Sequence, residues 1–280
     1  MPLITLTEIL KDAHNKKYGI AMFDVHNLEM TNAVIEAAEA EHSPVILALA
    51  EVHAIPLKAL NDISNIIVHA ARQASIPVCA HFDHGISLEN CIRVMHRGFT
   101  SVMYDGSVLP YDENVKNTAE VARIAALFGA SVEGELGHVG NNEGGEEDDA
   151  NLVLTDPAQT EDFINKTKID ALAVSIGTTH GFFKNTPKLD LNRLEAIRER
   201  CQVPLVLHGG SGLSDMDFCN CIQKGISKIN IYTEFVQMAI DAIRKNADRS
   251  NYRDLMQLSI EHMKEYVCQK LRLFGSSGKA

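Results

Sequence analysis

The sequence lacks the features that would place it in a membrane, outside the cell or on nucleic acid. No apolar run approaches the roughly 20 residues that span a bilayer. Residues 1–8 contain no basic region followed by an apolar core, so no signal peptide is expected. The formal net charge of −11 leaves no basic face for backbone phosphates. We therefore expect a cytoplasmic protein without membrane or nucleic-acid partners.

Cysteine motifs are missing as well. The six cysteines contain no CxxC spacing, and the closest pair is Cys219 and Cys221. This usage is typical of reduced, structural thiols in a cytoplasmic protein. A metal site in this chain would therefore be built from other ligands.

What the chain does have is apolar sequence enough for a large core. Its 280 residues are 45% hydrophobic, which suits one large α/β domain or two smaller ones. No linker that would split the chain is visible, so a single domain over residues 1–280 is expected.

Short buried strands alternate with amphipathic helices along the chain. The strand-like segments are 18–25, 44–50, 76–83, 101–105, 131–137, 171–177, 204–209 and 226–232. Helical spacing occurs at 6–16, 28–41, 57–74, 87–97, 111–128, 158–167, 191–201, after 214, at 234–246 and at 252–271. Eight such strands predict a (β/α)8 TIM barrel with an N-terminal helix and an additional C-terminal helix. A doubly wound open sheet has the same alternation, but its Gly-x-Gly-x-x-Gly turn is absent here.

The segment Ala80-His81-Phe82-Asp83-His84-Gly85 crowds three reactive side chains at one strand end. Because strand side chains alternate, His81 and Asp83 point one way while His84, at the turn, can point another. Taken alone, this could be a satisfied histidine and a helix-capping aspartate.

Polar residues recur at the carboxyl ends of the other strands, where barrels hold their catalytic groups. They are Asp24, His26, Glu51, Asp105, Glu133, Glu135, His180, His208 and Asn230. Histidines at three strand ends (His84, His180 and His208) predict a three-histidine zinc site with an open position. The alternative is three unrelated core or surface histidines. The remaining histidines at 14, 42, 53, 69, 96 and 262 fall on helices or helix ends and are expected to be solvated, and His138 could go either way.

Two loops suit an anion. His208-Gly209-Gly210-Ser211-Gly212 follows the seventh strand, and Asn230-Ile231-Tyr232-Thr233 ends the eighth. Loops at these positions bind phosphate in many barrels through N–H groups at a helix start.

A third loop, residues 138–151, is glycine-rich and acidic. Such a loop can be a solvated surface segment, which we expect for residues 146–149. At the catalytic face it can also be a lid that delivers a residue when it closes, and Glu143 is the candidate.

With these residues in hand, the chain resembles the class II, zinc-dependent fructose-/tagatose-bisphosphate aldolases nearly end to end. The shared motifs are Asp83-His84-Gly85, Val132-Glu133-Gly134-Glu135-Leu136-Gly137, Gly177-Thr178-Thr179-His180-Gly181, Pro204-Leu205-Val206-Leu207-His208-Gly209-Gly210-Ser211-Gly212 and Lys228-Ile229-Asn230-Ile231.

The resemblance implies roles for the strand-end residues. His84, His180 and His208 would bind zinc. Asp83 would exchange a proton with the C4 oxygen of the substrate, and Glu143 would exchange one with the nucleophilic carbon.

It also implies contacts with the substrate and with further ions. Asn230 would hold the enediolate hydroxyl. The site for the phosphate of dihydroxyacetone phosphate would be lined by Gly181, Gly209, Gly210, Ser211, Ile231, Tyr232 and Thr233. A second, alternative metal position matches His81, Asp105 and Glu135. A monovalent cation, Na⁺ or K⁺, would lie at carbonyls near Thr179, Gly181 and Gly209.

The chain departs from the family pattern where a second phosphate would bind. The family usually carries Asn at Asp24 and often Asn at His26, and its phosphate-binding Ser is Ala50 here, followed by Glu51. Arg253 matches the arginine that reaches the distal phosphate across a dimer, but Tyr252 replaces the Pro expected before it.

The function implied is reversible cleavage of a ketose 1,6-bisphosphate, or a related ketose 1-phosphate, to dihydroxyacetone phosphate and an aldehyde. The carbanion formed needs an electron sink, which zinc supplies by stabilising the enediolate. A Schiff-base lysine could serve instead, but only Lys228 is near a strand end, and we expect it on the wrong side of the barrel. The alternatives are a zinc-dependent barrel hydrolase, for which Asp24-Val25-His26 is a poor match to the usual His-x-His, and a non-catalytic sugar-phosphate-binding subunit. A homodimer or homotetramer is expected.

Overall fold

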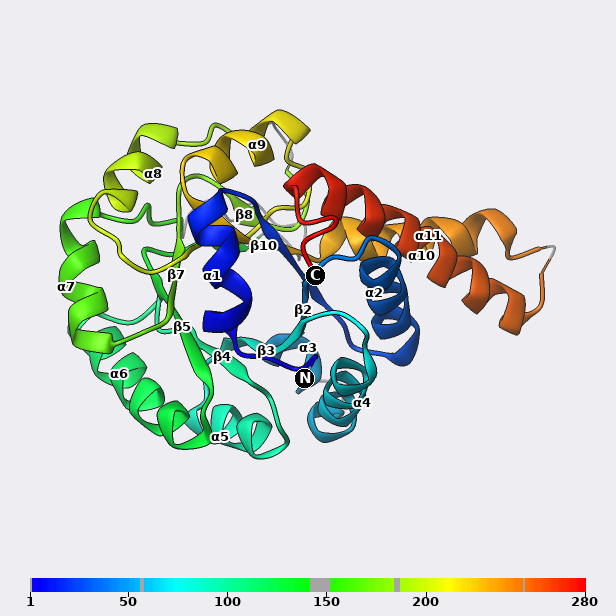
Figure 1. Cartoon of the computed structure of the whole chain (residues 1–280), viewed down its shortest axis with the longest axis horizontal. Coiled ribbons are helices and arrows are strands. Elements are labelled where there is room, and N and C mark those ends of the chain that lie inside the picture. Colours follow the sequence, from blue (N-terminus) through cyan, green and yellow to red (C-terminus); the bar gives the residue numbers. More distant parts are fainter. Residues whose placement is uncertain (1, 56–57, 142–151, 184–186, 249) are drawn as a thin grey trace.

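The alternating strands close on themselves into the predicted barrel (Figure 1). The computed structural model describes residues 2–55, 58–141, 152–183, 187–248 and 250–280. Around the barrel the strands follow the order β1 (Ile20–Asp24), β10 (Ile226–Ile231), β9 (Leu205–Leu207), β7 (Ala171–Val174), β5 (Ser131–Leu136), β4 (Ser101–Tyr104), β3 (Val78–Gly85) and β2 (Val45–Ala50). All neighbouring pairs are parallel, and β1 pairs with both β2 and β10, so the open-sheet alternative is wrong.

Helices surround the barrel, as expected for strands joined by crossovers. They are α2 (Leu28–Ala40), α3 (Glu51–Ala54), α4 (Leu60–Gln73), α5 (Leu88–His96), α6 (Tyr111–Phe128), α7 (Pro157–Thr167), α8 (Leu191–Arg198), α9 (Asp215–Gln223) and α10 (Thr233–Asn246). The strands are buried on both sides because outward-facing residues such as Phe82 and Leu207 pack against the helices. The burial explains why these segments are apolar runs rather than alternating patterns.

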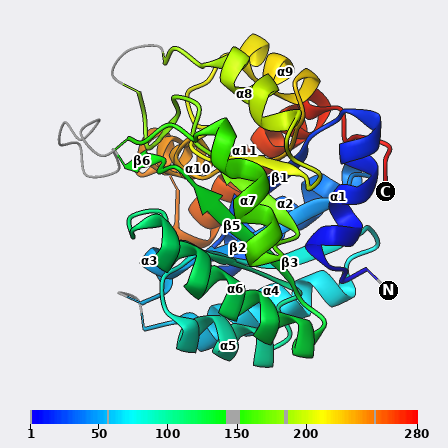
Figure 2. The ribbon, with the colours of Figure 1, turned by 90° about the vertical axis from the view of Figure 1, so that its left-hand side faces the viewer.

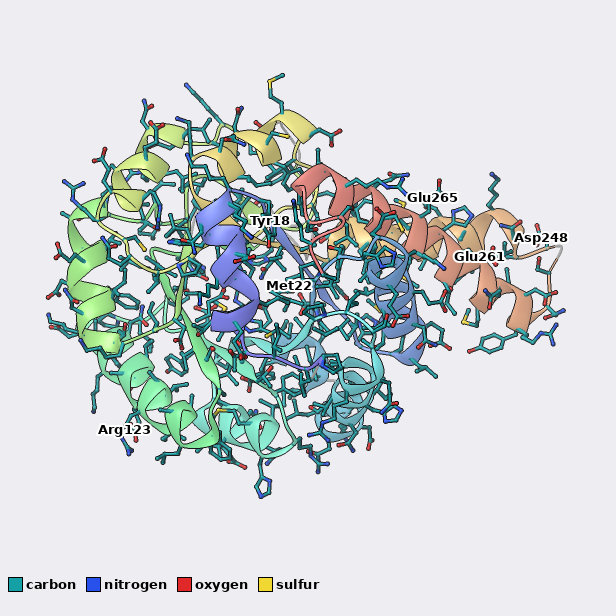
Figure 3. All side chains as sticks on the ribbon, viewed as in Figure 1. Tyr18, Met22, Arg123, Asp248, Glu261 and Glu265 are labelled. Atoms are coloured by element: carbon teal, nitrogen blue, oxygen red, sulfur yellow. The ribbon has the colours of Figure 1, made fainter. Side chains whose placement is uncertain are left out.

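The amino ends of the strands are closed by α1 (Leu6–Lys16). Thr5 and Glu8 form a capping box at its start, and its apolar face joins the inward-facing residues Ile20, Ile46 and Val206 in one cluster. Figure 3 places Tyr18 and Met22, two members of that cluster, over the middle of the barrel.

Two long helices project from the barrel on one side (Figure 1). They are α10 and α11 (Tyr252–Phe274), and α11 packs against both α10 and α2. In Figure 3 the labelled residues Asp248 and Glu261 lie on this projecting part. Among the described residues, no helix is both long and apolar enough to cross a bilayer.

Element bounds differ from the predicted ones mainly at strand ends. The sixth and seventh predicted strands shorten to β7 and β9, because the chain beyond them leaves the barrel to form loops. One of these loops contributes β8 (Thr179–His180), which pairs with β6 (Gly140–Asn141) in a small parallel sheet that the sequence did not predict. The short helix α3 was also unforeseen.

The barrel interior changes character along its axis. Its lower part, next to α1, is apolar, whereas alternate residues above it carry charge or imidazole rings. These buried polar residues are His81, Asp83, Glu133, Glu135, His208, Lys228 and Asn230. Since buried charges are costly unless paired, this layer marks the functional end of the barrel.

Candidate metal centre and active site

Three histidine rings converge at the carboxyl end of the barrel. Nε2 of His84 lies 3.0 Å from Nδ1 of His208, and the His180 ring centroid lies 4.8 Å from that of His84. One nitrogen from each ring lies within 4.8 Å of the others. The structure therefore brings together the three histidines predicted from separate strand ends.

The outer nitrogens of two of these rings face carboxylates. Nδ1 of His84 lies 2.8 Å from Asp105 Oδ2, and Nε2 of His208 lies 2.8 Å from Glu133 Oε1. Metal-binding histidines usually donate their second N–H to such partners, which fixes the tautomer and the ring orientation. Nε2 of His180 is buried without a hydrogen-bond partner. An inward-facing nitrogen set with carboxylates behind it fits a zinc ion with an open position.

The backbone at the end of β3 turns His84 toward the other two rings. The pairing of β3 with β4 shifts register between Phe82 and Gly85, and His84 has a φ of 46°. A left-handed conformation is costly for a residue with a side chain, and such strain is found at functional positions. The next residue is Gly85. A Cβ at this position would lie only 2.8 Å from the Met103 carbonyl oxygen, so the turn requires a glycine here.

Asp83 and Asn230 lie beside the histidines. The Asp83 carboxylate is 1% exposed, and Oδ2 lies 3.6 Å from His84 Nε2. Asn230 Nδ2 donates to Asp83 Oδ1 over 3.4 Å. Burial opposes ionisation of Asp83, but His84 and His81 hold its pKa well below its usual value. Asp83 is therefore poised as a carboxylate that can accept a proton.

Lys228, which we expected on the wrong side of the barrel to form a Schiff base, lies inside the barrel. It is fully buried, and Nζ donates to Glu133 Oε2 over 2.8 Å. The inward alternation of β10 places it two residues below Asn230. Burial opposes ionisation of Glu133, but Lys228 and His208 lower its pKa to about 2. Glu133 and Lys228 thus form an ion pair next to the His208 ring, and the Lys228 ammonium is held by the Glu133 carboxylate.

The residues predicted for a second metal position separate into two groups. Asp105 and Glu135 gather with His84, whereas His81 gathers with Asp83 and Glu133. Nδ1 of His81 lies 2.8 Å from Ser101 Oγ, deeper in the barrel. The regular alternation of β3 carries His81 below Asp83, away from Asp105.

The predicted phosphate-binding residues line one small recess next to the histidines. They are Gly181, Gly209, Gly210, Ser211, Asn230, Ile231, Tyr232 and Thr233. The recess lies at the start of α10, where Ser211 Oγ accepts from the Glu234 N–H over 3.2 Å, and its free volume is about 20 Å³. A Cβ at Gly209 would lie 2.5 Å from the Thr179 carbonyl oxygen, so only glycine permits this approach of the two loops. Free N–H groups at a helix start are suited to an anion.

A larger cavity of about 550 Å³ opens on the other side of His84 and His180. Its lining includes Asp24, Glu51 and His53. His53 was expected to be solvated, but it is partly buried and its ring stacks on Tyr232 with centroids 4.3 Å apart. Its position three residues past the end of β2 was the available signal. The predicted solvation holds for His42, His69, His96 and His262, which are exposed.

His138, left open from the sequence, lies in this cavity wall, where Nδ1 is 2.7 Å from Ser107 Oγ. Glu143 lies outside the described residues. The segment that leads to it begins at β6, whose Asn141 pairs with the metal-site residue His180 in β8. Arg253 lies in the first turn of α11 with its side chain 93% exposed, and it does not line the cavity.

Comparison with known proteins connects this geometry to a family. The family model of class-II fructose-bisphosphate aldolases matches residues 4–279. The chain belongs to this family. It is therefore a class II aldolase, a carbon–carbon lyase, and such enzymes are generally metal-dependent and act on sugar phosphates.

Individual relatives agree over their full lengths. A probable fructose-bisphosphate aldolase of Bacillus subtilis is 38% identical, covering 100% of both chains. The YdjI protein of Escherichia coli is 41% identical over 96% of both chains. The crystal structure of this YdjI aldolase superposes with a TM-score of 0.90 over 99% of each chain. A putative aldolase structure from Coccidioides immitis also has a TM-score of 0.90, with 30% identity over 98% of this chain and 97% of its own.

Proposed function

We propose that this aldolase is zinc-dependent and reversibly cleaves a ketose 1-phosphate or ketose 1,6-bisphosphate to dihydroxyacetone phosphate and an aldehyde. The observation that carries the proposal is the inward-facing nitrogen set of His84, His180 and His208, with carboxylates behind two of the rings. Its position between the phosphate recess and the larger cavity suits a substrate that extends from one to the other.

Zinc, when bound, supplies a Lewis acid that stabilises the negative charge left when the bond between C3 and C4 breaks. Asp83 accepts the proton of the C4 hydroxyl, and the bond electrons move to C3 and the ketone. Glu143 then returns a proton to C3, the nucleophilic carbon. Asn230, 3.4 Å from Asp83, holds the hydroxyl of the enediolate.

The recess lined by Gly181, Gly209, Ser211 and Thr233 receives the phosphate of dihydroxyacetone phosphate. A monovalent cation at the carbonyls of Thr179, Gly181 and Gly209 would add positive charge beside that phosphate. Asp105 and Glu135, together with His84, offer the alternative metal position.

The test uses zinc-loaded protein with a panel of ketose 1-phosphates and 1,6-bisphosphates, and follows release of dihydroxyacetone phosphate with and without EDTA. EDTA should abolish turnover, and added zinc should restore it. Release that persists in EDTA at the zinc-loaded rate would contradict the proposal.

Two variants separate metal binding from proton transfer. His208→Ala should lose both zinc and turnover, because it removes a ligand. Asp83→Asn should keep zinc and lose about 10² to 10⁴-fold in kcat, the usual contribution of a general base. Zinc content is measured by atomic absorption, and turnover by a metal-free His208→Ala variant would exclude the assigned ligand set.

A further inference from the structure

The part of the site that receives the aldehyde half of the substrate carries acidic and apolar side chains. Its described lining contains no lysine or arginine. The cavity wall beyond the histidines includes the carboxylates of Asp24 and Glu51. Its rim is formed by Val52, Ile55 and Ile86, whose side chains are among the exposed large apolar ones. No Lys or Arg occurs among the described residues that line it.

The two ends of the site are chemically unequal. The recess lies at the start of α10 and beside Gly181 and Gly209, a setting that suits an anion. Asp24, Asp83, His180 and Tyr232 line both the recess and the cavity, so the two adjoin at the metal centre. A substrate with its phosphate in the recess therefore extends its other end into the acidic cavity.

The helix start that faces the cavity is already filled by the chain itself. Glu51 Oε2 accepts from the N–H groups of Ile86 and Ser87 over 2.8 and 3.3 Å, just before α5, and Oε1 accepts from Asn90 Nδ2 over 2.6 Å. Glu51 is only 6% exposed. These N–H groups could otherwise attract a phosphate. A carboxylate of the protein takes that place.

Two imidazoles beside this cavity, those of His26 and His53, do not supply positive charge at neutral pH. Burial lowers the pKa of His53 to about 4, with His26 adding to the effect, and burial also lowers the pKa of His26. His26, His53 and Tyr232 form one ring cluster, with centroids 4.3 to 6.1 Å apart. Stacked neutral rings and aliphatic side chains suit the carbon chain and hydroxyls of an uncharged aldehyde.

We infer that the physiological substrate is a ketose 1-phosphate whose aldehyde half bears no phosphate, and that Glu51 enforces this choice. The inference rests on the proposed function and narrows it. A second phosphate would meet carboxylates and an apolar rim, and like charges brought together at a binding site strongly disfavour the wrong partner.

The decisive experiment runs the reaction toward synthesis with zinc-loaded protein. D-Glyceraldehyde and D-glyceraldehyde 3-phosphate are compared as acceptors for dihydroxyacetone phosphate, because they differ only by the phosphate. In each case C3 of dihydroxyacetone phosphate loses one proton and bonds to the aldehyde carbon. The aldehyde oxygen takes up one proton and becomes the new hydroxyl. We expect kcat/KM to be at least about 10-fold higher with D-glyceraldehyde, the size of a like-charge penalty. Equal or higher kcat/KM with the phosphorylated acceptor would overturn the inference.

Deuterium exchange at C3 of dihydroxyacetone phosphate, followed by NMR in D₂O, tests the proposed function separately, since it needs no aldehyde. No exchange in the zinc-loaded protein would remove the proposed function and the inference with it. Exchange without the acceptor preference would remove the inference alone.

Glu51→Gln tests the assigned residue, since it removes the charge and keeps the size. The preference for D-glyceraldehyde should fall about 10-fold in this variant while C3 exchange persists. Glu89→Gln is the matched control, because Glu89 lies in the first turn of α5, the helix whose start Glu51 contacts, and its side chain is 78% exposed. An equal change in both variants would contradict a role for Glu51. A loss confined to the phosphorylated acceptor in Arg253→Ala would reveal a phosphate-binding cation and overturn the inference.

Discussion

At the scale of single residues, the site depends on buried groups that satisfy one another. Glu133 is the clearest case, because its two oxygens contact Lys228 and the proposed metal ligand His208, and all three side chains are fully buried. A buried pair of this kind contributes little net stability when intact, but removing one partner leaves a buried charge without compensation.

Glu133→Gln should therefore lower the free energy of unfolding by about 3 kcal/mol or more, because the Lys228 ammonium would remain buried. Urea titration of the zinc-free protein measures this without the contribution of the metal. Glu36→Gln, which removes an exposed pair with Lys264, should change it by less than about 1 kcal/mol. Adding Lys228→Met to Glu133→Gln should recover part of the loss. Equal losses of unfolding free energy in Glu133→Gln and Glu36→Gln would contradict the role assigned to the buried pair.

The sequence predicted the convergence of residues where strand ends fixed their position. His84, His180 and His208 could be found because all parallel strands end on one face of a barrel, so residues far apart in sequence meet there. Lys228 and His81 could not be placed well, because their depth depends on register and on the direction of alternation. The ion pair between Lys228 and Glu133 also depends on shear between distant strands, which no local pattern reveals.

At the scale of elements, α1 closes the barrel and its start is fixed by local chemistry. Thr5 Oγ1 accepts from Glu8 N–H over 3.2 Å, and Glu8 Oε2 accepts from Thr5 N–H over 2.8 Å. This capping box was not identified from the sequence, although the helix over residues 6–16 was predicted with its observed bounds.

Thr5→Ala should reduce the free energy of unfolding at pH 7 by about 1 kcal/mol, the usual contribution of an N-cap. Hydrogen bonds from Thr5 lower the pKa of Glu8 below its ordinary value of 4.5. The stabilisation is therefore present above pH 4.5 and is lost as the pH falls through the lowered pKa, so the difference between variant and wild type should shrink in acid. Lys11→Ala, an exposed change on the same helix, serves as the control. Urea midpoints at pH 7 and below pH 4 provide the measurement, and a difference that grows in acid would contradict the assignment.

Loops are the elements that the sequence described least. The β6–β8 sheet and α3 are too short to give a periodic pattern, yet they carry or position His180, Glu51 and His53. The cavity could not be foreseen for the same reason, since its walls come from loops after several strands.

At the scale of the whole molecule, the fold converges on the three histidines, so metal binding and folding should be linked. His84 lies in β3, His208 follows β9 and His180 lies in the β6–β8 sheet, so the three rings meet only in the folded chain. A ligand that binds only the folded state stabilises it by mass action.

Zinc at about 100 times its dissociation constant should therefore add about 2.7 kcal/mol to the free energy of unfolding. EDTA should reverse the gain. His180→Ala should unfold at the same urea concentration with and without zinc, whereas His262→Ala, which changes an exposed ring on α11, should keep the full zinc response. A zinc response retained in His180→Ala would show that the ion binds elsewhere.

The two chain ends give the molecule a practical orientation. Pro2 and Ile4 hydrogen-bond with Val78 at the beginning of β3, and Gly278 and Ala280 are held by carbonyls of Glu41 and His42. Figure 2 shows both ends on the side of α1, opposite β6. A purification tag or a surface linker attached at either end would therefore leave the mouth of the barrel facing the solution. Binding of sugar phosphates could be recorded on protein immobilised through either chain end, and the two attachments should give the same affinity.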